Sequence, residues 1–89
     1  MRIYRYEVPV DGEWHTWTLQ GEPLMVGCRK PEVVEFWADY VDDVAPVLAD
    51  FMVVGTGDPW PDEANEYVGT AIAPGGDLVW HLIRKTEAS

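Results

Sequence analysis

The sequence predicts a mainly β fold, a small antiparallel β-sandwich or partly closed barrel of about six or seven strands. Two observations lead to this prediction. Within 89 residues, 8 glycines and 7 prolines separate short apolar stretches, as turns separate strands. Several of these stretches alternate apolar and polar residues, which is the period of a half-buried strand. The length allows one domain over residues 1–89, built around one core.

The expected strands follow one another along the chain. Residues 2–10 alternate apolar and charged side chains, and residues 13–19 are rich in aromatic and β-branched types. Because Asp11-Gly12 lies between them, these two strands should pair as a hairpin. Further strands are expected at residues 24–28, 47–54, 66–72 and 77–84. The paired glycines of the turn before residue 77 should join the last two in a second hairpin.

Residues 31–45 allow two interpretations. Their apolar side chains recur at helical spacing behind Pro31, which favours a short amphipathic helix near residues 32–42. As a strand, the same segment would alternate apolar side chains with Glu35, and Asp42-Asp43 would begin a loop. Periodicity alone favours the helix.

Five tryptophans are unusual in so short a chain. Each indole can bury roughly 200 Å², so some should contribute to the core, while at least one is expected at the surface. Trp60 is the strongest candidate for exposure, because prolines frame it in a turn. The other residues expected in the core are Tyr4, Tyr6, Val26, Phe36, Phe51, Val53, Val68, Ile72 and Val79.

The charge of the chain restricts its partners. Acidic residues outnumber basic ones by 16 to 6, for a net charge of −10. Nucleic acids and anionic membranes attract cationic proteins, so neither is an expected partner. A basic protein partner or imitation of a polyanion fits this charge, although an acidic surface also serves solubility alone. The candidate contact carboxylates are Asp39, Asp42 and Asp43 in one stretch and Asp58 in the next.

The sequence also predicts a cytoplasmic location. Cys28 is the only cysteine, which excludes an internal disulfide and favours a reducing compartment. The first ten residues lack the apolar region of a signal peptide. No stretch approaches the ~18 apolar residues needed to cross a bilayer.

Gly55-Thr56-Gly57 raises the question of a phosphate loop or a turn that ends a strand. A phosphate loop needs inward-pointing backbone N–H groups and a nearby cation, usually at a helix N-terminus. Here Asp58 would repel a phosphate, and the prolines on either side of Trp60 donate no N–H group. The sequence therefore predicts a rigid turn, and the Trp60-Pro61 bond is a candidate for the cis form.

No catalytic group, metal site or cofactor is predicted, and the protein is predicted not to be an enzyme. Cys28 and Ser89 are candidate nucleophiles, but nothing in the spacing brings either of them to His15 or His81. Cys28 lies in an apolar run and is expected to be a small buried hydrophobe. The aspartates lack the offsets and the glycine of a calcium loop, and one cysteine with two histidines is too few for zinc.

Four motifs occur in order along most of the chain: FWA at 36–38, FMVVGTGDP at 51–59, YVGT at 67–70 and GGDLVWHL at 75–82. With the opening IYRYEV they resemble a family of short proteins found in phages and prophages. That family carries a GTGHP-like turn, a YIGT segment and a closing GGxLVFHVF strand. The resemblance implies phage origin and a strand over residues 32–38, but no activity, because the members are functionally uncharacterised. Asp58 stands where the family usually has histidine, which puts any role of that imidazole in doubt here.

Three functions fit these expectations. The leading one is a non-enzymatic phage accessory protein that binds a host protein in the cytoplasm of the infected bacterium, through an acidic surface with an exposed tryptophan. The alternative is a small-ligand or nucleotide-sequestering protein with a pocket near residues 55–60, within one chain or between protomers. The second alternative is a DNA-mimic inhibitor of a host nucleic-acid-binding protein. A homodimer is also considered, because small sheets leave unpaired edges. The candidate binding residues are Asp58, Trp60, His81, Asp39, Asp42 and Asp43.

Overall fold

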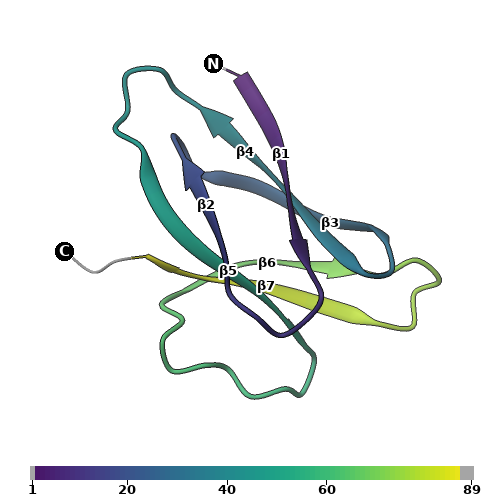
Figure 1. The fold of residues 1–89 in the computed structure, drawn as a ribbon. Helices are drawn as coiled ribbons and strands as arrows, with labels where there is room; N and C mark the ends of the chain where they lie inside the picture. Colours follow the sequence, from purple (N-terminus) through teal and green to yellow (C-terminus); the bar gives the residue numbers. More distant parts are fainter. Residues whose placement is uncertain (1, 87–89) are drawn as a thin grey trace.

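The computed structural model describes residues 2–86, which form two antiparallel sheets packed against each other (Figure 1). This part of the chain contains seven strands and no helix. The strands are β1 (Arg2–Pro9), β2 (His15–Leu19), β3 (Pro23–Lys30), β4 (Val33–Tyr40), β5 (Val47–Gly55), β6 (Glu66–Ile72) and β7 (Val79–Thr86). The predicted all-β sandwich is confirmed, with two separate sheets instead of a closed barrel. The candidate nucleophile Ser89 lies outside the described residues.

The sheets have the strand orders β1-β4-β3 and β2-β5-β7-β6. Since β1 and β2 belong to different sheets, the predicted hairpin between them is wrong. β1 pairs with β4 from Arg2↔Tyr40 to Pro9↔Val33, and β2 pairs with β5. Both β4 and β5 are thereby hydrogen-bonded on two sides, which satisfies the backbone groups of the two most buried strands. The second predicted hairpin, β6 with β7, is confirmed.

Strand β4 resolves the ambiguity at residues 31–45. Val34, Phe36 and Ala38 are fully buried and face the core, while Glu35 and Trp37 point to the outer face. The strand is confirmed and the helix is wrong, because ladders to β1 and β3 on both sides override the helical spacing of the apolar residues.

Aromatic rings from the two sheets meet in the core. The ring centroid of Phe36 in β4 lies 4.5 Å from that of Phe51 in β5, and Tyr6 in β1 stacks on Phe36 at 4.9 Å. The remaining members of this buried cluster are Val8, Leu19, Val34, Ala38, Ala49, Val53 and Leu82.

The predicted core is partly wrong. Tyr4 and Ile72 are exposed, because they lie near the ends of β1 and β6, which are edge strands with one neighbour each. Tyr6, Val26 and Val68 are partly buried and pack against the core. Val79 is also partly buried, and all five tryptophans keep part of their surface exposed. Cys28 was expected to be buried, but it is only half-buried.

The two sheets also touch where β3 packs on β6. A Cβ atom at Gly69 would lie only 2.6 Å from Cγ2 of Val26, so a side chain there would push β3 away. The register of β6 shifts between Tyr67 and Gly69, which forms a bulge at this contact. Glycine is therefore required by the packing of β6 beneath β3.

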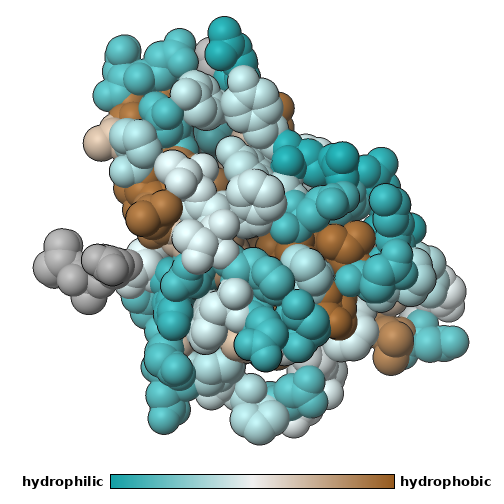
Figure 2. All heavy atoms as spheres, in the orientation of Figure 1, coloured by the Kyte–Doolittle hydropathy of each residue, from teal (hydrophilic) through white to brown (hydrophobic). Residues whose placement is uncertain are grey.

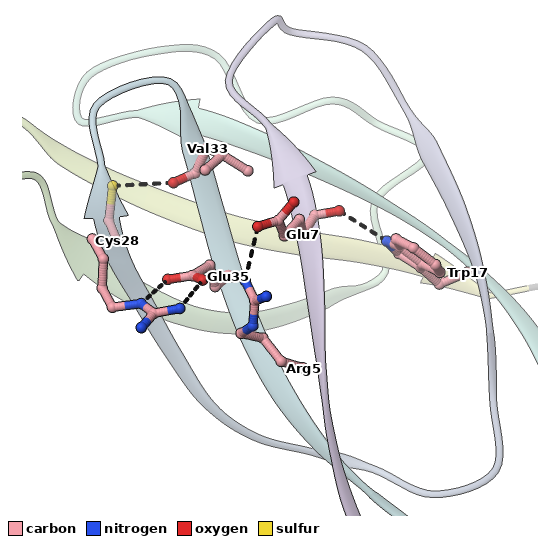
Figure 3. Close-up of polar contacts among 7 residues, drawn as sticks. Arg5, Glu7, Trp17, Cys28, Val33 and Glu35 are labelled. Carbon is pink, nitrogen blue, oxygen red and sulfur yellow. Dashed lines mark hydrogen bonds and ion pairs between the residues drawn. The ribbon is translucent and has the colours of Figure 1, made fainter.

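A buried carboxylate ties the three-stranded sheet together. Glu35 is 1% exposed, although it projects from the outer face of β4. Arg29 of β3 donates hydrogen bonds of 2.8 and 2.7 Å to its carboxylate, and Arg5 of β1 donates one of 2.6 Å (Figure 3). Hydrogen bonds from Arg29 and Arg5 outweigh the effect of burial and lower the pKa of Glu35 from 4.5 to about 2. Glu35 therefore stays ionised in the folded protein and links both flanking strands to β4.

We predict that Glu35→Gln lowers the free energy of unfolding by about 1–3 kcal/mol at pH 7, because both arginines lose a charged acceptor. The native pKa of Glu35 is below its unfolded value, so its contribution is complete above about pH 4.5 and is lost as the pH falls toward about 2. Urea unfolding at several pH values should show the difference from wild type shrinking over this range.

The matched control for this prediction is Glu7→Gln. The side chain of Glu7 is half-exposed and accepts a hydrogen bond from Arg5. Because exposed ion pairs are weak, Glu7→Gln should lower the free energy of unfolding by less than about 0.5 kcal/mol. Equal losses in the two variants would contradict the role given to Glu35.

Candidate functional site

A pocket of about 290 Å³ opens on the outer face of the four-stranded sheet, beside the turn that ends β5. Three of the predicted binding residues, Asp58, Trp60 and His81, line it together. The full lining, here called the Trp60 pocket, is Val54, Gly55, Thr56, Gly57, Asp58, Trp60, Tyr67 and His81.

The turn Gly55–Asp58 forms one wall of the pocket. Asp58 N donates to Gly55 O at 3.1 Å, and Gly55 N donates to the Asp58 carboxylate at 2.9 Å. Gly57 has a φ of +92°, the left-handed conformation that the third position of a type II turn requires. The Gly55 N–H, which a phosphate loop would offer to a ligand, is thus already bonded to the carboxylate of Asp58. The Trp60-Pro61 bond is trans, so the cis prediction is wrong: the glycine at position 57 makes the reversal of direction.

Hydroxyl groups hold His81 in place. Its Nε2 lies 2.9 Å from Thr56 Oγ1, and its Nδ1 lies 3.1 Å from Thr70 Oγ1 and 3.3 Å from the Tyr67 hydroxyl. A hydroxyl can donate or accept, so these partners suit either tautomer of the imidazole. The register of the sheet explains the cluster, because His81 in β7 is paired with Val54 of β5 and with Thr70 of β6.

This arrangement differs from a nucleophilic triad. In a triad, a carboxylate usually orients the imidazole and stabilises its charged form. Among residues 2–86, the hydrogen bonds to His81 come from hydroxyl groups alone. The ring lines the pocket and is held by these hydroxyl groups.

Trp60 is exposed, as predicted, and its position is fixed. It is 47% exposed and stacks on Tyr67, which is 49% exposed, with ring centroids 6.0 Å apart and planes at 26°. The indole Nε1 lies 3.5 Å from Ala64 O across the loop. Asn65 then closes the loop, because its N–H donates to Arg84 O at 3.0 Å and its side-chain amide donates to Thr86 O at 3.1 Å.

The loop around Trp60 is acidic. Residues 56–65 include Asp58, Asp62 and Glu63, all exposed, and no lysine or arginine. Figure 2 shows hydrophilic residues along the lower edge of the molecule, where this loop lies in Figure 1. We call Asp58, Trp60, Asp62, Glu63 and Tyr67 the Trp60 surface.

The other predicted carboxylates lie elsewhere. Asp39 accepts the backbone N–H of Glu22 at 2.5 Å and so holds the turn between β2 and β3. Asp42 and Asp43 are exposed in the loop after β4. Figure 1 shows this loop and the loop 56–65 at opposite ends of the molecule, with β5 running between them. The two acidic stretches therefore do not form one site.

Cys28 belongs to the other sheet and is not activated. Its sulfur lies 3.0 Å from Lys30 O and 3.4 Å from Val33 O. Burial, and then the negative charge of Glu35, raise the pKa of the Cys28 thiol, so it stays protonated at neutral pH. The part of the chain that the structure describes contains no cluster of three or more histidine, cysteine or acidic side chains able to hold a metal ion. None of residues 2–86 belongs to a helix long and apolar enough to span a bilayer.

Thr56 lies within residues 55–60, where a pocket was expected, although it was not singled out, and sequence reasoning missed Tyr67 and Thr70. The available signal was their position in the GTG and YVGT motifs, one on each of the strands that flank β7. Their convergence on His81 depends on the pairing of β5 and β6 with β7, which the motifs alone do not specify.

Comparison with curated proteins and with solved structures finds no match. A family model matches residues 1–89, the whole chain. The chain therefore belongs to the family described as a domain of unknown function, DUF7352.

Proposed function

We propose that this protein is a non-enzymatic accessory protein of phage origin that binds a basic host protein in the bacterial cytoplasm through the Trp60 surface. The observation that carries the proposal is the environment of Trp60. Its indole is half-exposed and stacked on Tyr67, in a loop with three carboxylates and no cation. Tryptophan is enriched among the residues that dominate protein–protein binding energies.

Charge supports a basic partner. A net charge of −10 attracts cationic surfaces over distances near a Debye length and accelerates their encounter. At the surface itself, an arginine or lysine of the partner can lie on the exposed face of Trp60 and reach the carboxylate of Asp58 or Asp62. The indole of Trp60 and a neighbouring carboxylate would then bind the same cationic side chain of the partner.

The loop also supports binding because it is already ordered. Pro59 and Pro61 fix two backbone φ angles, and the bonds of Asn65 to β7 close the loop. A contact residue held in its bound position loses little conformational entropy on association. A few strong contacts at Trp60 can therefore give useful affinity from a small surface.

The chemistry of the candidate catalytic groups favours binding over catalysis. The raised pKa of Cys28 keeps its thiol protonated, and the sulfur lies in the three-stranded sheet while His81 lies in the four-stranded one. Thr56 and His81 are within hydrogen-bonding distance, but Thr70 and Tyr67 stand where a triad would have its carboxylate.

Small-ligand binding in the Trp60 pocket is the second candidate. The hydroxyl groups of Thr56, Thr70 and Tyr67 converge there on His81, beside two aromatic rings. Its volume of about 290 Å³ is at the lower end of the range of roughly 300–1,000 Å³ for small-molecule sites. That size suits one partner side chain or a fragment better than a whole nucleotide. Imitation of DNA is less well supported, because the two acidic stretches lie at opposite ends of β5 (Figure 1).

Trp60→Ala should reduce the affinity for the host protein about 30-fold or more, since truncating a hot-spot tryptophan costs about 2 kcal/mol or more. Tagged wild type and variant are used to capture proteins from host lysate, and the Kd of the captured protein is then measured. Tyr4→Ala, an exposed aromatic on the other sheet, is the control and should bind like wild type. A captured protein retained equally by all three would contradict the proposal, as would unfolding of Trp60→Ala, which would make Trp60 a core residue.

The charge of the loop should act locally. Asp62→Asn with Glu63→Gln, and Asp42→Asn with Asp43→Asn, both change the net charge from −10 to −8. We expect only the first pair to slow association with the host protein severalfold at low salt, with the difference vanishing near 0.5 M salt, roughly where screening is strong. Surface plasmon resonance at several salt concentrations measures these rates. Equal slowing by both pairs would show that total charge acts, and not the Trp60 surface.

The second candidate has its own test. If the Trp60 pocket binds a nucleotide or metabolite, that compound should raise the thermal midpoint of wild type but not of His81→Ala. A thermal-shift screen with a panel of such compounds measures this. A panel without any shift in wild type would remove this candidate.

A further inference from the structure

The outer face of the three-stranded sheet carries an apolar patch, far from the Trp60 pocket in the fold. Ile3, Leu24, Met25 and Trp37 line a hollow of about 400 Å³ there. Met25 is 65% exposed and is paired with Trp37 across β3 and β4. We call these four residues the Met25 face.

Two features of β3 build this face. The register of β3 shifts between Pro23 and Met25, and both Leu24 and Met25 line the hollow although they are consecutive residues. At Gly27, a Cβ atom would lie 3.2 Å from the ring of Trp37, so the absence of a side chain leaves room for the indole to lie over β3. The apolar side chains are therefore gathered on one side and not distributed over both faces.

Most of the charges beside the Met25 face are already paired, and Asp39, which lies opposite Ile3 in the register, accepts the backbone N–H of Glu22. Glu35 accepts hydrogen bonds from Arg29 and Arg5, and Arg5 also bonds to Glu7 (Figure 3). These four side chains sum to zero charge. The face can thus be covered without leaving an ion that needs a charged partner, whose absence would be costly.

This neutrality is local. Four of the six basic residues of the chain, Arg2, Arg5, Arg29 and Lys30, are in β1 and β3, so the excess of negative charge lies on the rest of the molecule. Two copies, each with a net charge of −10, repel one another in most orientations. At the Met25 face they meet with apolar side chains beside mostly paired charges, and this face is the same on both.

We propose that two copies of this chain form a symmetric dimer by packing their Met25 faces against each other, sheet on sheet. A basic foreign partner would bind where the negative charge is concentrated, outside this face. A second copy instead brings an identical apolar face, as a two-fold symmetric dimer requires. A sheet of three strands of eight residues covers roughly 14 × 26 Å, so two copies bury at most about 730 Å² in total. That area is below the roughly 1,200–2,000 Å² of stable specific interfaces, so we expect a weak, transient dimer with a Kd in the micromolar range.

The dimer is independent of the proposed host contact and compatible with it. The Trp60 pocket is on the outer face of the other sheet, so it stays open on both copies. The dimer would present two Trp60 surfaces on opposite sides, which favours a partner with repeated or paired sites.

Sedimentation equilibrium of the full chain, from about 1 to about 500 µM, tests the proposal over a range that brackets a micromolar Kd. Wild type should change from monomer to dimer, and Met25→Asp and Leu24→Asp should each remain monomeric. Ile72→Asp is the matched control, because Ile72 is 63% exposed on the outer face of the other sheet. It should form dimers like wild type.

Circular dichroism confirms that each variant is folded before the comparison. A wild type that stays monomeric at every concentration would overturn the proposal and assign the Met25 face to another partner. Dimers of folded Met25→Asp and Leu24→Asp with the wild-type Kd would also overturn it, as would loss of the dimer in Ile72→Asp alone.

Discussion

Phe36 and Phe51 touch across the core at 4.5 Å, each fully buried and each on a strand that is paired on both sides. This contact holds the three-stranded sheet against the four-stranded one, and smaller side chains such as Val34 and Leu82 fill the space around it. In a chain of 89 residues no second core is available to compensate for its loss. Because the phenylalanines fill the centre, the tryptophans can lie toward the surface, where one of them supplies the candidate contact.

The site depends on the same framework through β7. Strand β7 lies between β5 and β6, and its register sets His81 beside Val54 on one side and Thr70 on the other. The polar cluster is therefore built on strands, which position side chains more rigidly than a loop does. The loop contributes Asp58 and Trp60, and it is fixed to the strands at both ends. Rigid strands beneath an ordered acidic loop are the basis of the proposed host contact.

Local features of the fold could be predicted from the sequence, and pairings could not. Six expected strands follow from alternation and turn glycines, which are local signals, and all six exist with ends shifted by at most a few residues. The strand expected at residues 32–38 also exists, but it was implied by the resemblance, because the local periodicity favoured a helix. The β1–β2 hairpin was wrong because Asp11-Gly12 predicts a reversal of direction but not whether the chain stays in the same sheet. At the site, the prolines on either side of Trp60 identified it as exposed. The proximity of Asp58, Trp60 and His81, and the role of Tyr67, follow from pairings between distant segments.

Gly55 joins the surface of the molecule to its interior. A Cβ atom there would lie 2.9 Å from the carboxylate of Asp58 and 3.3 Å from the ring of Trp80, so a side chain at this position would displace the Asp58 carboxylate and press on the indole. Its amide is bonded to a side chain of the Trp60 surface, and on its other side lies Trp80, whose ring packs on the core. The NMR chemical shift of the Gly55 amide should therefore change when a binding partner moves the Asp58 side chain. That makes Gly55 a natural reporter for NMR spectroscopy of isotope-labelled protein, without any attached probe and without knowledge of what has docked.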